Sequence, residues 1–323
     1  MNVPIFSIII PLYNAKVFIE KTLESILTQN FKEFEVIIIN DGSTDGGEEI
    51  CEDLCNKDFR LKLINQKNHG VSYSRNRAIK ESKGEYIIFV DADDFIEENF
   101  LNHLSVDQEN HPDSFIIQDF FKIGLDAVKK DVYKLIDQEL SISDFILQFD
   151  LTKFGHIASK IYSRSILINN NIKFPEHIKL SEDSIFFIDY LNFVDKIYLS
   201  SKKGYYYREV ENSAITKKIS MNEIFDLYNL LNTSLNRLVK MKNVAVNEKE
   251  KLKFWIKAVI DNVYSLNLDE NQRIDYLRFI RERYYNDVIF LYSKSKFRGR
   301  ILKLSFQLGL LHFFDKMFQK FER

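Results

Sequence analysis

The sequence is poor in cysteine, proline and tryptophan, with two Cys, four Pro and one Trp among 323 residues. Cys51 and Cys55 stand four residues apart in a predicted helix, and no second pair or neighbouring histidines complete a zinc site. No stretch approaches the ~18 consecutive apolar residues of a membrane-spanning helix. The N-terminus also lacks the basic segment and apolar run of a secretory signal. We therefore expect a cytoplasmic protein with reduced thiols.

The sequence also lacks an excess of charge of one sign. Its 45 Lys and Arg nearly balance 47 Asp and Glu, which gives no overall electrostatic reason to expect nucleic acid as a partner. Neither glycine-rich phosphate loop, G-x-x-x-x-G-K-[ST] or G-x-G-x-x-G, follows a predicted strand. These absences disfavour a P-loop ATPase and a Rossmann dehydrogenase. With 45% hydrophobic residues, the chain has enough apolar material for one large or two ordinary domains.

Short apolar runs alternate with helical patterns over the first hundred residues. The runs FSIIIP, FEVIII, LKLI and YIIFV lack polar alternation, which is typical of parallel strands buried on both faces. Between them we expect one helix with Asn14 as its N-cap, a second beginning near Asp45, and a third running from Val71 to a cap at Gly84. The order βαβαβαβ predicts an α/β fold.

A polar cluster follows each of the four predicted strands. The clusters are PLYN (11–14), NDGSTD (40–45), NQKNHG (65–70) and DADD (91–94). Turn chemistry alone explains any one of them, because Asn, Asp, Gly and Ser dominate turns. In open parallel sheets, however, ligands bind at the carboxyl ends of the strands. Four clusters at four strand ends therefore predict one binding site.

Three carboxylates, Asp91, Asp93 and Asp94, lie within four positions of the last cluster. Carboxylates placed so close together repel one another unless a divalent cation neutralises them. Mg²⁺ and Mn²⁺ prefer hard oxygen ligands, and Mg²⁺ is often held by one or two protein carboxylates together with substrate phosphates. The pattern predicts a site for Mn²⁺ or Mg²⁺ and a diphosphate.

The segments SIIIPLYN, VIIINDGSTD, NHGVSYSRNRAI and GEYIIFVDADD, within residues 5 to 100, resemble the nucleotide-sugar domain of glycosyltransferase family 2. The resemblance implies a GT-A fold, a Rossmann-like and mostly parallel sheet flanked by helices. It also implies a UDP-linked sugar donor, a divalent metal, and transfer with inversion at the anomeric carbon.

Carried over by position, the resemblance assigns a role to each residue of these motifs. Pro11, Tyr13 and Asp41 hold the base, Asn68 and Arg75 lie near the nucleotide and its diphosphate, Asp91 lies near the ribose, Asp93 binds the metal, and Asp94 fixes the loop. Arg208, within YYYREVENSAIT, resembles a basic residue that family members bring to the diphosphate. Its alternative interpretation is a strand-end arginine in solvent.

A later segment, KLSEDSIFFIDYL, predicts a helix with Glu182 and Asp183 in its first turn. Acidic residues at a helix start also complement the helix dipole. The segment nevertheless resembles the family's Glu-Asp motif, in which a carboxylate faces the acceptor hydroxyl and accepts its proton. Asp183 is our candidate base, and Glu182 is the alternative base or orients the acceptor. His156, near Lys160 in the same half, is interpreted as a structural histidine.

The sequence predicts three regions: residues 1–110 as the nucleotide-sugar half of a GT-A domain, 111–219 as its acceptor half, and 220–323 as a C-terminal helical region. In residues 293–323, eight basic residues stand against two acidic ones. Apolar residues from Phe306 to Phe321 recur at helical spacing and predict a basic amphipathic helix that lies on an anionic membrane surface. The alternatives are a helix packed on the protein's own core or on a second subunit of a homodimer.

Together these features predict a metal-dependent inverting glycosyltransferase. We expect it to move one hexose or N-acetylhexosamine from a UDP-sugar to a hydroxyl of a glycan or lipid-linked acceptor in bacterial surface polysaccharide synthesis. Processive synthases of the family typically carry transmembrane helices and a Gln-x-x-Arg-Trp motif, and this sequence has neither. The alternatives are a sugar nucleotidyltransferase and a non-catalytic nucleotide-sugar-binding protein.

Overall fold

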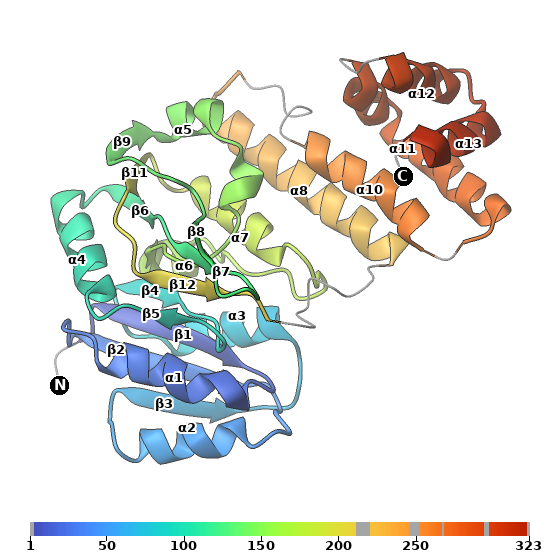
Figure 1. The fold of residues 1–323 in the computed structure, drawn as a ribbon. Coiled ribbons are helices and arrows are strands. Elements are labelled where there is room, and N and C mark those ends of the chain that lie inside the picture. The colour runs from blue at the N-terminus through green and yellow to red at the C-terminus, as the bar shows by residue number, and fades with distance from the viewer. Residues whose placement is uncertain (1–2, 211–219, 246–251, 267, 294–296, 322–323) are drawn as a thin grey trace. The chain divides into compact units, whose positions relative to one another are not determined.

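The structure, a computed structural model, describes residues 3–210, 220–245, 252–266, 268–293 and 297–321. The chain divides into two compact units (Figure 1). The first unit is Met1–Ile215 with Met241–Val244, and the second is Thr216–Lys240 with Ala245–Arg323.

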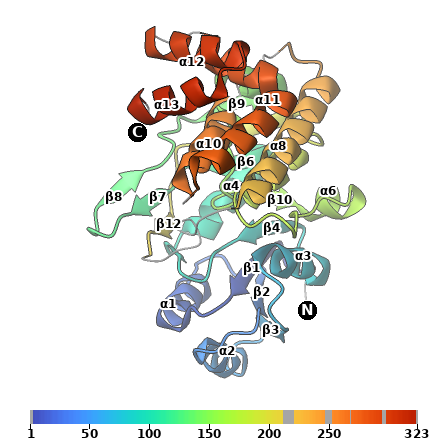
Figure 2. The ribbon, with the colours of Figure 1, turned by 90° about the vertical axis from the view of Figure 1, so that its right-hand side faces the viewer.

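The first unit is built on a five-stranded sheet in the order β10-β4-β1-β2-β3, parallel except for β10. The elements that form it are β1 (Phe6–Leu12), α1 (Lys16–Leu27), β2 (Phe34–Asn40), α2 (Gly47–Cys55), β3 (Leu61–Asn65), α3 (Val71–Glu81), β4 (Tyr86–Phe89) and β10 (Tyr162–Ser163). Helices α1 and α2 cover one face and α3 covers the other (Figures 1 and 2). The predicted βαβαβαβ order is confirmed.

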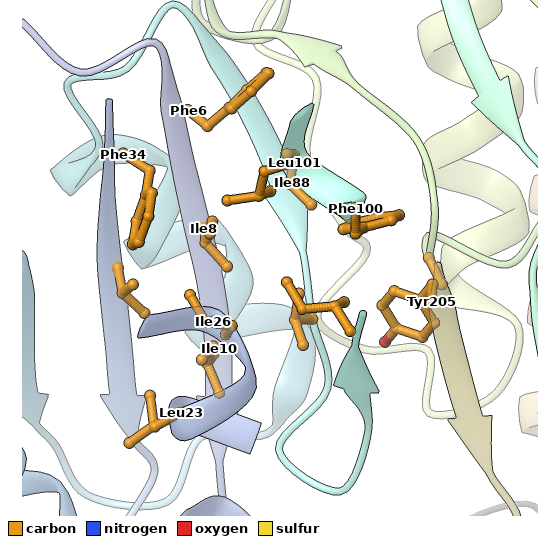
Figure 3. Packing of buried hydrophobic residues seen from close by; sticks show 14 of the residues in the cluster. Phe6, Ile8, Ile10, Leu23, Ile26, Phe34, Ile88, Phe100, Leu101 and Tyr205 are labelled. Atoms are coloured by element: carbon orange, nitrogen blue, oxygen red, sulfur yellow. The ribbon is translucent and has the colours of Figure 1, made fainter. Parts of the chain in front are cut away.

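The apolar strand runs form the core because both faces of this sheet are covered. Ile8 and Ile10 pack with Leu23 and Ile26 of α1 in one hydrophobic cluster (Figure 3). Successive side chains of a strand point to opposite faces, and Ile9 is fully buried as well. Burial on both faces explains why these strands show no polar alternation.

Two predicted helix caps are wrong. Helix α1 begins at Lys16 with Ala15 at the N-cap position. Asn14 instead adopts a left-handed φ of 49° and accepts a hydrogen bond from the Thr44 backbone N–H at 2.8 Å. Helix α3 ends at Glu81, before Gly84. Gly84 is needed for close packing, because a Cβ there would lie 2.6 Å from the Ser7 backbone nitrogen.

The rest of the first unit forms two smaller sheets, in the orders β6-β11-β9 and β5-β12-β7-β8. Its elements are β5 (Phe95–Ile96), α4 (Phe100–Asn110), β6 (Ser114–Gln118), β7 (Phe121–Ile123), β8 (Lys129–Asp131), β9 (Gln138–Ser141), α5 (Ile142–Gln148), the 3-10 helix η1 (Leu151–Phe154), α6 (Arg164–Asn169), α7 (Glu182–Leu191), β11 (Lys196–Ser200) and β12 (Tyr205–Arg208). Strands β4 and β10 pair, as do β5 and β12, so elements from 1–110 and 111–219 share sheets.

The second unit is helical, as predicted for the chain after residue 220. It contains α8 (Met221–Met241, whose last residue belongs to the first unit), α10 (Lys253–Ser265), α11 (Glu270–Ser293), α12 (Phe297–Gln307) and α13 (Leu311–Phe321). Helix α11 bends at Tyr284, whose φ of −121° is not helical. None of the helices in the described ranges is long and apolar enough to cross a membrane.

The single amphipathic helix predicted through Phe306 and Phe321 is wrong. The chain leaves the helix after Gln307, turns at Gly309 with a left-handed φ of 72°, and starts α13 at Leu311. Phe314 and Phe318 are buried within the unit, where Phe318 stacks on Tyr264 with ring centroids 4.3 Å apart. These two rings therefore pack on the protein's own helices, which was the alternative interpretation of the pattern.

Candidate active site

The ends of the first three strands are joined by backbone hydrogen bonds. Asp41 N–H donates to the Leu12 carbonyl at 2.8 Å, and Gln66 N–H donates to the Asn40 carbonyl at 3.0 Å. Gly42 has a φ of 75°, and a Cβ there would lie 3.1 Å from the Asn68 backbone nitrogen. The polar clusters after β1, β2 and β3 therefore form one continuous loop surface.

Asp41 is the buried centre of that surface. Its Oδ1 accepts hydrogen bonds from Gln66 Nε2 at 2.8 Å and the His69 backbone N–H at 2.9 Å, and its Oδ2 accepts one from the Gly70 N–H at 2.7 Å. An ionised carboxylate offers about four acceptor sites, so these three bonds leave one for a ligand. Around it Pro11 is partly buried, whereas Tyr13 and Asn68 are exposed.

Of the three carboxylates after β4, Asp94 holds the loop. It is buried, and it accepts hydrogen bonds from Tyr205 Oη at 2.6 Å and from the Arg208 backbone N–H at 2.8 Å. Tyr205 Oη also accepts a hydrogen bond from the Asp91 N–H at 3.2 Å. Tyr205 thus fixes Asp91 and Asp94 relative to each other. Nothing in the sequence distinguishes it from the tyrosines beside it.

Asp93 is the residue whose chemistry fits a divalent cation. Burial and the nearby Asp91 raise the pKa of Asp93 to about 6, while Arg208 lowers it. A bound cation would favour the ionised form that this environment disfavours. Within the described ranges, no three Asp, Glu, His or Cys side chains form a complete metal-binding group. One carboxylate with substrate phosphates is a known arrangement for Mg²⁺.

Arg208 lies close enough to Asp93 to affect its pKa. It is the last residue of β12, and its guanidinium lies over the rings of Phe18 and Phe95, 4.9 and 5.3 Å from their centroids. The side chain is only partly exposed. It is therefore held by two aromatic rings near Asp93, and the interpretation as an arginine in solvent is wrong.

A single guanidinium joins the carboxylate loop after β4 to the first turn of α7. Arg75 on α3 donates from Nη2 to Asp91 Oδ1 at 2.9 Å, and from Nη1 to Glu182 Oε1 at 3.1 Å and Asp183 Oδ1 at 2.8 Å. Its side chain is 5% exposed, against 21% for Asp183. We call these four side chains the carboxylate–arginine cluster. The sequence predicted its members separately but not their contact.

Charge is unbalanced in the carboxylate–arginine cluster, which has three carboxylates for one guanidinium. Burial opposes ionisation of Arg75, yet the carboxylates raise its pKa, so it stays charged. Burial raises the pKa of Asp183 well above its ordinary value, Arg75 lowers it, and Glu182 and Asp91 raise it further. A carboxyl group with a raised pKa is a better proton acceptor than an ordinary aspartate, which suits a general base.

The first turn of α7 is held in a constrained position. Ser181, just before Glu182, has a left-handed φ of 57°, and its side chain makes no capping hydrogen bond. The loop after η1 packs directly on this turn, because a Cβ on Gly155 would lie 2.0 Å from Ser184 Oγ. Backbone strain and close packing thus fix where the two acidic side chains point.

A partly buried histidine and a buried lysine lie on the same loop. Burial lowers the pKa of His156 to about 4, so its ring is neutral at pH 7. The ring contacts Tyr207 and Phe120, with centroids 4.8 and 5.3 Å apart. These contacts support the interpretation of His156 as a structural residue. Lys160 is fully buried, which its sequence context did not indicate.

Comparison with known proteins identifies the family. The model of glycosyl transferase family 2 matches residues 7–169. The chain belongs to this family. The resemblance seen in the sequence motifs is thereby confirmed, and it extends beyond them to residue 169. Glycosyl transferase family 2 is a family of enzymes that transfer sugars.

Among relatives, this family 2 chain is 31% identical over 233 residues to EpsJ of Bacillus subtilis (strain 168), an uncharacterized glycosyltransferase, covering 68% of the chain and 66% of EpsJ. It is 30% identical over 233 residues to TarS of Staphylococcus aureus (strain Mu50), a poly(ribitol-phosphate) beta-N-acetylglucosaminyltransferase, covering 70% of the chain and 39% of TarS. The match thus spans just under two thirds of EpsJ and well under half of TarS.

The fold matches solved structures of the same family. The crystal structure of S. aureus TarS 1–349 in complex with UDP-GlcNAc has a TM-score of 0.74 and 22% identity, covering 98% of this chain and 91% of that one. The complex of TarS 1–349 with UDP matches equally well. The predicted GT-A fold with a C-terminal helical region is confirmed.

Proposed function

We propose that this chain is a metal-dependent inverting glycosyltransferase that moves one sugar from a UDP-sugar to a hydroxyl group. The observation that carries the proposal is the shared guanidinium of Arg75. It donates both to Asp91, which follows β4 on the proposed donor side, and to Asp183 in the Glu-Asp turn of α7, at 2.9 and 2.8 Å. A base held beside a donor site is the arrangement that a one-step displacement requires.

In the proposed reaction, Asp183 accepts the proton of the acceptor hydroxyl as that oxygen attacks the anomeric carbon. Its Oδ1 already accepts from Arg75, so Oδ2 is the oxygen that we assign to the acceptor. Glu182, which shares Arg75 Nη1, orients the acceptor or serves as the alternative base. The bond to the diphosphate breaks on the opposite face of the sugar, and the anomeric configuration inverts.

On the donor side, the remaining acceptor site of Asp41 binds the uracil N–H, with Pro11 and Tyr13 against the base and Asn68 near the nucleotide. Asp91 lies near the ribose and Arg208 near the diphosphate. Asp93 would hold Mn²⁺ or Mg²⁺, which when bound supplies positive charge against the departing diphosphate. That TarS 1–349 forms complexes with UDP-GlcNAc and UDP supports a UDP-linked donor.

The relatives indicate the setting. TarS of S. aureus is named as an N-acetylglucosaminyltransferase acting on poly(ribitol-phosphate), and a matched protein of B. subtilis (strain 168) is named as a minor teichoic acid biosynthesis protein. We therefore propose transfer of a hexose or N-acetylhexosamine in bacterial surface polysaccharide synthesis. The acceptor is then a glycan or a lipid-linked precursor at the inner face of the cell membrane.

The surface of the second unit offers a means of reaching that membrane. Leu304, Leu308, Leu310 and Phe313 are exposed around the turn between α12 and α13. Basic residues lie on the same two helices, at positions 300, 303, 316 and 320. We propose that this turn docks on anionic lipid, as apolar side chains flanked by Lys and Arg do in interfacial segments.

The experiment that tests the catalytic proposal incubates the protein with a panel of UDP-sugars and Mn²⁺. Slow release of UDP that disappears with EDTA is the expected result. Formation or consumption of pyrophosphate would instead indicate a nucleotidyltransferase. Binding of UDP-sugars without turnover, with every candidate acceptor added, would indicate a non-catalytic binding protein.

A further inference from the structure

Lys160 is a buried lysine whose described partners are all neutral. It is 0% exposed. Its Nζ donates to the carbonyl oxygen of His156, to that of Ala158 at 3.4 Å and to Tyr133 Oη at 3.4 Å. Among the described residues, no carboxylate oxygen lies within 4.0 Å of it. A buried ammonium group with only neutral partners costs free energy, so its presence calls for a reason.

The fold places Lys160 against α7, the helix that carries Asp183. Ser159, the residue before it, is buried and has a left-handed φ of 60°. The Lys160 Nζ lies 5.5 Å from the ring centroid of Phe187. Phe187 is four residues after Asp183 on α7, and residues four apart share one face of a helix. Because Gly155 also packs on Ser184, the whole loop lies against the turn that carries Asp183.

A raised pKa makes Asp183 a stronger base only while the group is still ionised at the working pH, and at this turn three carboxylates share one guanidinium. A general base accepts a proton only in its carboxylate form, yet burial, Glu182 and Asp91 all raise the pKa of Asp183. Arg75 opposes them, but the same guanidinium also pairs with Asp91 and Glu182. A second cation near Asp183 would add to the effect of Arg75 and lower the pKa of Asp183 further.

The other titratable groups around this position do not supply that charge. Burial raises the pKa of Tyr133 and of Tyr162, so both phenols stay neutral, and burial lowers the pKa of His156 to about 4. Burial also lowers the pKa of Lys160, to about 7, and Asp183 raises it. Electrostatic interactions are mutual, so the ammonium form of Lys160 must lower the pKa of Asp183 in turn.

We propose that Lys160 is a positioning residue for sugar transfer, whose buried ammonium group acts through space on Asp183 and keeps it in the carboxylate form. The proposal rests on the proposed role of Asp183 as base. Lys160 does not touch either substrate in this scheme. With a pKa of about 7, Lys160 is fully charged at acidic pH and about half charged at pH 7, and acidic pH is where Asp183 would otherwise be protonated.

Two substitutions separate the charge of Lys160 from its hydrogen bonds. Lys160→Met removes both, whereas Lys160→Gln removes the charge but keeps an N–H donor for the carbonyl oxygens. Lys153→Met is the matched control, because Lys153 is exposed on η1 of the same segment. The measurements are the pKa of Asp183, from NMR of protein labelled with ¹³Cγ-aspartate and assigned with Asp183→Asn, and the dependence of kcat on pH.

Both Lys160 variants are expected to raise the pKa of Asp183 by about one unit and to move the acidic limb of the kcat profile upward by the same amount. At pH values well below the wild-type pKa of Asp183, kcat then falls roughly tenfold, since one pKa unit is a tenfold change in protonation. At high pH, kcat approaches the wild-type value. The control variant leaves the Asp183 pKa and the profile unchanged.

An unchanged Asp183 pKa in Lys160→Gln would overturn the proposal, as would a fall in kcat that is the same at every pH. If Lys160→Met does not fold, Lys160→Gln alone decides between these outcomes. Failure of the proposed function has a different signature. In that case the pKa of Asp183 still shifts in the Lys160 variants, while no UDP-sugar is turned over by the wild type.

Discussion

At the scale of single residues, the two acidic side chains of α7 differ in their distance from Arg75 and in their exposure to solvent. Asp183 lies 2.8 Å from Arg75 Nη1 and is 21% exposed, whereas Glu182 lies 3.1 Å away and is 11% exposed. The more accessible carboxylate is the one that an acceptor can reach. The geometry therefore favours Asp183 as the base.

Asp183→Asn is expected to lower kcat by about 10²-fold or more, because the amide cannot accept the proton of the acceptor hydroxyl. The affinity for the UDP-sugar should change little, since Asp183 lies on the acceptor side. Glu182→Gln is the matched variant and should lose less activity. Steady-state kinetics on both variants check the assignment, and a larger loss in Glu182→Gln would move the base to Glu182.

Asp93→Asn is expected to abolish Mn²⁺-dependent turnover and to weaken UDP binding only when metal is present. The variant should unfold at nearly the wild-type temperature, because Asp93 is partly exposed in a strand-end loop that tolerates polar changes. Calorimetry of UDP binding with Mn²⁺ and with EDTA measures the effect. Equal UDP affinity of the variant and the wild type in Mn²⁺ would remove Asp93 from the metal site.

At the scale of elements, strands were more predictable than caps and turns. The runs FSIIIP and FEVIII form β1 and β2 because a strand buried on both faces has one requirement, apolar side chains, which a sequence shows directly. The cap at Asn14 and the one at Gly84 were wrong for another reason. Asn14 bonds to Thr44 and Gly84 packs on Ser7, partners that are distant in sequence and become neighbours only in the folded chain.

The contact between Gly155 and α7 gives a prediction of its own. In Gly155→Ala the new methyl group would lie 2.0 Å from Ser184 Oγ and overlap it, so the loop and the acidic turn must separate. Overpacking of this kind costs about 1–3 kcal/mol, and kcat should fall as Asp183 moves.

A second substitution supplies the control for this contact. Adding Ser184→Ala removes the nearest atom and should restore part of the lost stability and activity. Thermal unfolding and kcat of the single and double variants measure both effects. A Gly155→Ala protein with wild-type stability and turnover would show that the contact does not position α7.

At the scale of the whole molecule, the candidate site was predictable where it follows the motifs and unpredictable where it depends on packing. The strand-end residues from Pro11 to Asp93 were found because the carboxyl ends of parallel strands converge. Tyr205 and Lys160 could not be singled out from the sequence, because their burial depends on which elements pack together. The single C-terminal amphipathic helix was predicted wrongly for a related reason. Periodicity shows that a helix has an apolar face, but it does not show what covers that face.

The proposed membrane contact of the second unit is tested by exchanging one exposed aromatic residue. Phe313→Glu should abolish co-sedimentation with anionic liposomes, because it places a negative charge among the exposed leucines between α12 and α13. Phe254→Glu on α10 is the matched control, since Phe254 is 64% exposed against 48% for Phe313. Binding that survives in Phe313→Glu, or a wild type that binds no anionic vesicles, would reject this contact. A molecular mass in solution that rises with protein concentration, in a protein that binds no vesicles, would indicate that this surface forms a dimer.

The left-handed serine that precedes Glu182 also bears on the balance between stability and activity. A left-handed conformation costs an ordinary residue about 1–2 kcal/mol and is more easily adopted by asparagine. Ser181 has no capping hydrogen bond to lose, so Ser181→Asn should raise the unfolding temperature by about 2–4 °C for each kcal/mol recovered. Calorimetry and kcat, measured together, check this. A more stable variant with slower turnover would show that natural selection has kept stability low at this turn in favour of catalysis.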